Sequence, residues 1–166
     1  MKIEEWGIED VLGMAVKTEA HGRRFYESLS ERISHPDVKT KILSLANDEK
    51  RHQGIMEDLY RRTLGKEPRD LPQRGIPDII RAISSLRISD KTQVLQLLDM
   101  AIEAESISAK FYQRGASISP DPRTMRIFQE LEREEDGHFN YLVAEKAALS
   151  GDLYWFSISD SAMMEE

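Results

Sequence analysis

Two short segments of this sequence pair a glutamate with a histidine three residues later. The first holds Glu49 and His52, in "NDEKRH", and the second holds Glu135 and His138, in "REEDGH". Residues three apart on a helix lie on one face about a turn apart, so each pair can converge on one point. Carboxylate and imidazole together bind several divalent metals. One such pair alone is more often a solvated helix face, whereas two matched copies indicate metal binding.

An internal repeat relates the two pairs. An offset of 86 residues superimposes equivalent positions of the two halves, which are Glu19 and Glu105, Tyr26 and Tyr112, Glu49 and Glu135, and His52 and His138. In each half, 30 residues separate the first glutamate from the second. The sequence therefore predicts two helical hairpins with a pseudo-two-fold relation, each giving one Glu from its first helix and a Glu-x-x-His from its second.

The four glutamates fall within apolar stripes, where an unpaired carboxylate would cost several kcal/mol or stay protonated. Two divalent cations would offset about four negative charges, and two neutral imidazoles would complete the coordination. The alternative is that the glutamates pair with nearby cationic side chains, for which the candidates are Arg23, Arg24, Arg51 and Lys110. On the first interpretation, the metal ligands are Glu19, Glu49, His52, Glu105, Glu135 and His138.

Four apolar stripes of helical period position these side chains, over residues 8–33, 38–59, 94–112 and 128–149. "SHPD" separates the first two stripes and "SPDP" the last two; we expect the second helix to end near Gly65 and the fourth at Ser150 and Gly151. Residues 65–90 hold three of the six prolines and form a long crossover, with an apolar turn near residues 79–86 and a helix cap at Ser89 or Asp90. The predicted fold is all-α, a four-helix bundle.

The composition fits this architecture and excludes several classes of function. A chain of 166 residues with 40% hydrophobic content suits one compact domain, which we place at residues 1–151. The absence of cysteine excludes disulfides, thiolate nucleophiles and iron–sulfur clusters. A net charge of -7 argues against nucleic-acid binding. No stretch approaches the roughly 20 apolar residues of a membrane span and no signal peptide is evident, so we expect a cytoplasmic protein.

The tail, residues 152–166, forms a separate short segment after the predicted bundle. It carries Tyr154, Trp155 and Phe156 in succession. So much aromatic surface is unfavourable in water, and we expect the tail to pack onto the bundle or onto a partner subunit.

The sequence resembles the ferritin-like di-iron carboxylate proteins, most closely the rubrerythrin type. "TEAHGRRFY" and "AESISAKFY", together with "NDEKRH" and "REEDGH", carry the resemblance, which spans about residues 5–150. It implies a ferritin-like bundle that holds about two iron ions per chain, with manganese or a mixed Mn/Fe centre as alternatives. In this assignment the bridging ligands are Glu49 and Glu135, and the terminal carboxylates are Glu19 and Glu105. Each metal also has one histidine, His52 or His138.

The resemblance also gives Tyr26 and Tyr112 a role beside the metals. Each lies seven residues after a predicted terminal ligand, and it would hydrogen-bond a ligand carboxylate and assist proton delivery. The alternative is that both are core aromatic residues. Gly22 and Gly137 either relieve crowding beside the metals or ease helix packing.

The function implied by the resemblance is reduction of hydrogen peroxide or dioxygen by a homodimer. Electrons would come from an external rubredoxin-like protein or flavoprotein, because the chain lacks the cysteines of a rubredoxin domain. Ser108 stands where rubrerythrins often carry a further glutamate that exchanges with a histidine during turnover. The alternatives are a ferroxidase that assembles into a storage shell and a metal-free helical adaptor.

Overall fold

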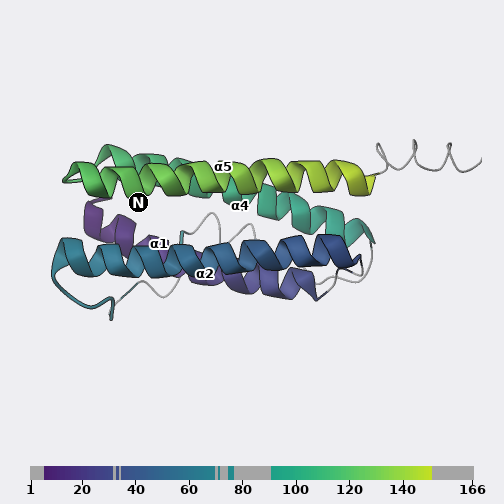
Figure 1. Cartoon of the computed structure of the whole chain (residues 1–166), viewed down its shortest axis with the longest axis horizontal. Helices are drawn as coiled ribbons and strands as arrows, with labels where there is room; N and C mark the ends of the chain where they lie inside the picture. Colours follow the sequence, from purple (N-terminus) through teal and green to yellow (C-terminus); the bar gives the residue numbers. More distant parts are fainter. Residues whose placement is uncertain are drawn as a thin grey trace, which may run out of the picture.

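The computed structural model describes residues 6–31, 33, 35–69, 71, 75–76 and 91–150. These residues form four α-helices and no strand, with the helices labelled α1 (Ile8–Ser30), α2 (Pro36–Leu64), α4 (Lys91–Ser117) and α5 (Pro122–Ser150). The helices lie side by side as an elongated bundle (Figure 1). The predicted all-α four-helix bundle is therefore confirmed.

The helix ends follow from local sequence chemistry. Pro36 and Pro122 are the first residues of α2 and α5, where the missing N–H of proline costs no hydrogen bond. The Asp121 carboxylate accepts hydrogen bonds from the backbone N–H groups of Arg123 and Thr124 at 2.9 and 3.0 Å, which caps α5. The second helix ends near Gly65 as predicted, and Gly65 caps it in a left-handed conformation with φ of 66°.

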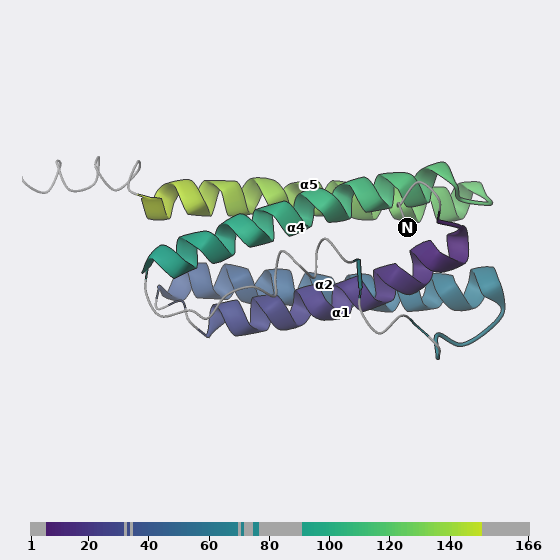
Figure 2. The ribbon, with the colours of Figure 1, turned by 180° about the vertical axis from the view of Figure 1, so that it is seen from behind.

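The helices associate as two antiparallel hairpins, α1 with α2 and α4 with α5. Seen from behind, α1 and α4 form one broad face of the bundle and α2 and α5 the other (Figure 2). The end of α2 and the start of α4 lie at opposite ends of the bundle. Residues 65–90 therefore connect opposite ends of the bundle.

Two described residues of this connection are anchored on α1. The backbone N–H of Ile76 donates a hydrogen bond to Thr18 Oγ1 at 2.8 Å, and the Ile76 side chain is fully buried. A Cβ atom on Gly75 would lie 2.5 Å from Thr18 Oγ1, so only glycine fits this close approach without a shift. Gly75 and Ile76 thus lie against the middle of α1.

Parts of the sequence prediction lie outside the described residues. These are the apolar turn at residues 79–86, the helix cap at Ser89 or Asp90 and the tail at 152–166. The division into a bundle at residues 1–151 and a separate tail stays a prediction.

Two apolar clusters fill the interior of the bundle. One includes Leu12, Met56 and Phe128, and the other includes Leu29, Ile42 and Leu142. The predicted metal ligands are buried as well, on the same four helices. No helix in the described ranges is long and apolar enough to cross a membrane.

Candidate metal centre

The bundle brings all six predicted metal ligands into one buried cluster. They form two overlapping groups, Glu19, Glu49, His52 and Glu135 in one, and Glu49, Glu105, Glu135 and His138 in the other. Within each group one ligand atom per residue lies within 4.8 Å of all the others. Glu49 and Glu135 belong to both groups, which is the geometry that bridging ligands require.

Each imidazole directs its Nδ1 atom toward several carboxylates. His52 Nδ1 lies 2.9 Å from Glu135 Oε1 and 3.5 Å from Glu19 Oε2. Ligands held about 2.0–2.2 Å from a shared cation are separated by about 3–3.5 Å, so these spacings suit coordination to one ion. The two imidazole rings are nearly parallel, with their centroids 5.8 Å apart.

His138 has the equivalent surroundings in the second group. Its Nδ1 atom lies 3.6 Å from Glu49 Oε1, and 3.7 Å from both Glu105 Oε2 and Glu135 Oε2. Three carboxylates therefore converge on this imidazole, from three different helices.

Several atoms of the cluster have no hydrogen-bond partner. The buried atoms without one include Glu19 Oε2, Glu49 Oε1, His52 Nδ1, Glu135 Oε1 and His138 Nδ1. The contacts among them, including His52 Nδ1 to Glu135 Oε1 at 2.9 Å, are ion-pair separations without hydrogen-bond geometry. Buried polar atoms are nearly always hydrogen-bonded, because an unsatisfied one loses its interaction with water. Five such atoms directed into one region, all of them carboxylate oxygens or imidazole nitrogens, fit a pair of divalent cations. That these residues bind metal stays a prediction.

The pKa values of the metal-free cluster reflect the same crowding of negative charge. Burial and the neighbouring carboxylates of Glu19 and Glu135 raise the pKa of Glu49 well above its ordinary value. Burial, followed by Glu105, raises the pKa of Glu135 to about 8. Burial by itself would lower the pKa of His52, but the Glu135 and Glu19 carboxylates raise it to about 10. Without metal, protons compensate the charge that cations would otherwise neutralise.

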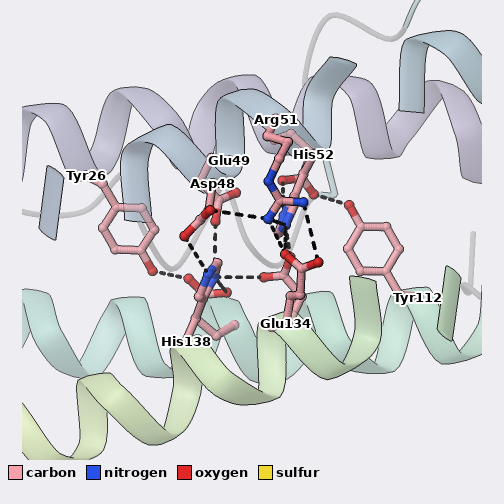
Figure 3. A network of polar contacts seen from close by, with 11 residues as sticks. Tyr26, Asp48, Glu49, Arg51, His52, Tyr112, Glu134 and His138 are labelled. Atoms are coloured by element: carbon pink, nitrogen blue, oxygen red, sulfur yellow. Dashed lines mark hydrogen bonds and ion pairs between the residues drawn. The ribbon is translucent and has the colours of Figure 1, made fainter. Parts of the chain in front are cut away.

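A further pair of acidic residues contacts the outer edges of the imidazoles. His52 Nε2 lies 2.9 Å from Glu134 Oε2, and His138 Nε2 lies 3.6 Å from Asp48 Oδ2. Each carboxylate comes from the helix opposite its histidine, so the contacts cross between α2 and α5 (Figure 3). A carboxylate at this nitrogen orients a metal-bound imidazole and fixes its tautomer.

These two residues were not predicted from the sequence, although the repeat contains a signal for them. Asp48 and Glu134 are equivalent under the offset of 86 residues, and each directly precedes a predicted bridging glutamate. Arg51 contacts both of these carboxylates: it donates hydrogen bonds to Glu134 and to Asp48. The residue equivalent to Arg51 is Gly137, so the repeat is asymmetric here.

The two predicted tyrosines flank the cluster at its two ends (Figure 3). The Tyr26 hydroxyl donates a hydrogen bond to Glu105 Oε1, and the Tyr112 hydroxyl donates one to Glu19 Oε1. Each tyrosine therefore contacts the terminal carboxylate of the other hairpin, not the glutamate of its own helix. The predicted carboxylate contact is present, while a catalytic role for either tyrosine stays a prediction.

The structure also decides between the two roles considered for the glycines. A Cβ atom on Gly22 would lie 2.8 Å from Glu49 Oε2, so this glycine makes room for a predicted bridging ligand. A Cβ atom on Gly137 would meet nothing within 4 Å. Gly22 thus relieves crowding at the cluster, and Gly137 does not.

Comparisons with known proteins agree with this architecture. Residues 10–146 match the family described as Rubrerythrin. A solved structure of a hypothetical protein from Pyrococcus furiosus is similar, with 30% sequence identity, a TM-score of 0.78 and an alignment that covers 93% of this chain and 98% of that chain. No curated protein matches the sequence.

Proposed function

Because this chain belongs to the rubrerythrin family, we propose that it is a di-iron oxidoreductase that reduces hydrogen peroxide with electrons from an external donor. The ligands would be Glu19, Glu49, His52, Glu105, Glu135 and His138. Iron is the metal favoured by the family, while the ligand types would also accept manganese.

The observation that supports a dinuclear centre most strongly is the set of buried ligand atoms without hydrogen-bond partners. They belong to two groups that share Glu49 and Glu135. Each group supplies four ligands, so one cation bound by one group would leave buried ligand atoms of the other group without a partner.

In the proposed reaction, these residues would hold iron, which would supply the two electrons that cleave the O–O bond of peroxide, and the protein would supply position and protons. Glu134 and Asp48 orient the imidazoles. Tyr26 and Tyr112 hold the terminal carboxylates by hydrogen bonds, and burial with the neighbouring glutamates keeps the pKa of each phenol well above its ordinary value. Both phenols therefore stay protonated at neutral pH and keep donating hydrogen bonds to Glu105 and Glu19.

A metal-free adaptor receives less support from the ion pairs. It would need arginines or lysines among the buried glutamates. Of the nearby cationic residues, Arg23 pairs with Glu27, and Arg51 pairs with Asp48 and Glu134. Neither is directed at the four predicted carboxylate ligands.

The first test is anaerobic Fe(II) titration of the metal-free protein. We expect saturation at about two iron ions per chain. Glu105→Ala removes a predicted ligand and should reduce the stoichiometry or weaken binding by at least about tenfold. Glu103→Ala is the matched control, because Glu103 is an exposed glutamate two residues away on the same helix. Equal binding by both variants would contradict the proposed ligand set.

The second test concerns the substrate. The reduced protein is mixed rapidly with hydrogen peroxide or with dioxygen, and oxidation is followed by absorbance. We expect peroxide to react faster; faster oxidation by dioxygen would indicate an oxidase or a ferroxidase instead. A sizing column separates the homodimer that we propose from a storage shell.

The tyrosines are tested in the same assay. Tyr26→Phe and Tyr112→Phe should each slow peroxide-dependent oxidation while iron still binds. Tyr141→Phe is the control, because Tyr141 is only partly buried and lies outside the cluster. Unchanged rates in both cluster variants would assign these tyrosines to the core alone.

A further inference from the structure

The two predicted metal positions differ in how well the protein covers their outer edges. His52 is fully buried, whereas His138 is 8% exposed, the highest value among the six predicted ligands. Both imidazoles turn their Nε2 atoms toward the surface between α2 and α5, where a carboxylate meets each of them (Figure 3). The cluster therefore lies closest to solvent at His138.

Side chains close the edge at His52. The Glu134 carboxylate lies against His52 Nε2, and Arg51 donates hydrogen bonds to Glu134 in turn. A surface groove between α2 and α5 reaches Arg51 and Glu134, but His52 is not among the residues that line it. A metal ion approaching along this groove would have to separate the ion pair and then move a fully buried imidazole.

The equivalent edge at His138 lacks such a cover. The residue that corresponds to Arg51 in the repeat is Gly137, which is exposed and has no atom within 4 Å of the place of a Cβ. Asp48 supplies the carboxylate here, with a side chain that is 36% exposed. Arg51 bonds Asp48 Oδ1, and Asp48 Oδ2 lies 3.6 Å from His138 Nε2. A carboxylate oxygen and an imidazole nitrogen thus stand together at the surface.

Another approach to the carboxylates lies between α1 and α4, but it is narrow. The space there, lined by residues that include Gly22, Glu105 and Ser108, has a volume of about 20 Å³ for the centre of a water molecule. One water needs roughly 10–15 Å³ by this measure, so a hydrated cation does not fit. Removing all of its water at once would be unfavourable for a divalent cation. At Asp48 and His138, protein ligands can replace the waters one at a time.

We propose that metal ions enter and leave the centre at the edge formed by Asp48, Gly137 and His138. The proposal rests on the proposed di-iron function and adds to it the route by which the metals are loaded. Asp48 attracts the cation, and the His138 imidazole turns aside into the room left by the missing side chain at Gly137. The ion then reaches the nearer metal position, and the farther position, at His52, is filled through the nearer one.

The test measures how fast the metal-free protein takes up Co(II), followed by absorbance in a stopped-flow instrument. Gly137→Arg gives this edge the cover that Arg51 provides at His52, and it should slow uptake by about tenfold or more. An arginine that merely supported Asp48 would slow metal release and leave uptake unchanged. Gly137→Gln covers the edge without adding charge and should slow uptake to a smaller degree.

Two further variants separate the effect of cover from that of charge. Gly54→Arg makes the same substitution at another exposed glycine near a predicted ligand, and it should change the uptake rate by less than about twofold. The double variant Arg51→Gly/Gly137→Arg keeps the net charge and exchanges the two edges. Its uptake rate should return to within about threefold of the wild type, because the edge at His52 is then open.

The possible results distinguish the route from the di-iron function. Normal uptake by both Gly137 variants, or equal slowing by Gly54→Arg, overturns the route and leaves the metal centre intact. Slow uptake by Ser108→Leu together with normal uptake by Gly137→Arg places the entrance between α1 and α4 and also overturns it. Failure of the wild type to bind either Co(II) or Fe(II) overturns both the route and the proposed function.

Discussion

Glu135 shows what it costs to bury a carboxylate in this cluster without metal. It is 1% exposed, and burial with the nearby Glu105 raises its pKa to about 8, from an ordinary value of 4.5. The buried carboxyl group therefore keeps a proton that the unfolded chain would release in neutral solution. This difference ties both stability and metal binding to pH.

We expect the metal-free protein to lose stability as pH rises from about 4.5 to about 8. Below this range Glu135 is protonated in both states; within it, only the unfolded state releases the proton. The raised pKa of His52, about 10, acts in the same direction at higher pH. Thermal unfolding followed by circular dichroism at several pH values measures the effect.

Glu135→Gln is the control for this pH dependence. It removes the titrating carboxyl group, so its unfolding temperature should fall less steeply between pH 5 and 8. Divalent metal should reverse the trend in the wild type, because cations replace the protons and bind more tightly as pH rises. Parallel curves for the two metal-free proteins would show that Glu135 titrates at an ordinary pKa.

Gly22→Ala should weaken metal binding. The added Cβ would lie 2.8 Å from Glu49 Oε2, so the carboxylate must move away from the position shared by both metals. We expect a loss of about tenfold or more in iron affinity, measured by competition with a chelator. Gly54→Ala is the control, since a Cβ there meets nothing within 4 Å and should stabilise α2 by up to about 1 kcal/mol. Equal iron affinity in the two variants would contradict this explanation of Gly22.

The helices α2 and α5 supply equivalent ligands but differ in how firmly they hold them. On α2, Arg51 contacts Glu134, the carboxylate that supports His52. Burial by itself would raise the pKa of Glu134, but hydrogen bonds with Arg51 and His52 lower it to about 2, so it stays ionised. On α5 the equivalent of Arg51 is Gly137, so Asp48 shares Arg51 with Glu134. The contact of Asp48 with His138 Nε2 is also longer, 3.6 Å against 2.9 Å between Glu134 and His52 Nε2. The metal position of His52 should be the more stable one.

We therefore expect a chelator to remove the two metals in two phases. Arg51→Gln should accelerate the slower phase of metal release by about tenfold. Loss of a group that supports a metal ligand typically weakens metal binding by about 10–100-fold, and we expect the lower value because Arg51 acts through Glu134. Stopped-flow or manual absorbance measurements of metal release give both rates. Lys50→Gln is the control, because Lys50 is an exposed neighbour of Arg51 and the substitution removes the same positive charge. A single phase, or acceleration of both phases alike, would contradict the asymmetry.

The long crossover determines how the two hairpins combine. Because α2 ends at one end of the bundle and α4 begins at the other, α2 and α4 run parallel (Figure 2). The predicted ligand pairs Glu49–His52 and Glu135–His138 therefore meet on the antiparallel helices α2 and α5. The hydrogen bond from Ile76 N–H to Thr18 fixes the crossover against α1, one residue before Glu19.

Thr18→Val should destabilise the protein by about 1–3 kcal/mol, because it leaves the Ile76 N–H without its acceptor inside the protein. Valine has nearly the same shape, so the change tests the hydrogen bond more than the packing. Urea unfolding measures the difference. Thr40→Val is the control, since Thr40 is exposed and bonds only the Pro36 carbonyl of its own helix. An equal effect of the two changes would show that the anchor contributes little.

The sequence by itself determined the helices and the ligand candidates. Helical periodicity and proline or glycine at the helix ends are local properties, so α1, α2 and the C-cap at Gly65 could be read directly. The offset of 86 residues gave the two hairpins and the six predicted ligands, because a repeat carries spacing information over long range.

Contacts between the hairpins were decided only by the tertiary structure. Tyr26 bonds Glu105 and Tyr112 bonds Glu19, although each tyrosine is nearer in sequence to the other glutamate. The contacts of Glu134 with His52 and of Asp48 with His138 likewise depend on how α2 and α5 face each other. Periodicity specifies which face of a helix is buried, but the partner across the interface depends on the relative position of two helices, which no spacing within one helix encodes.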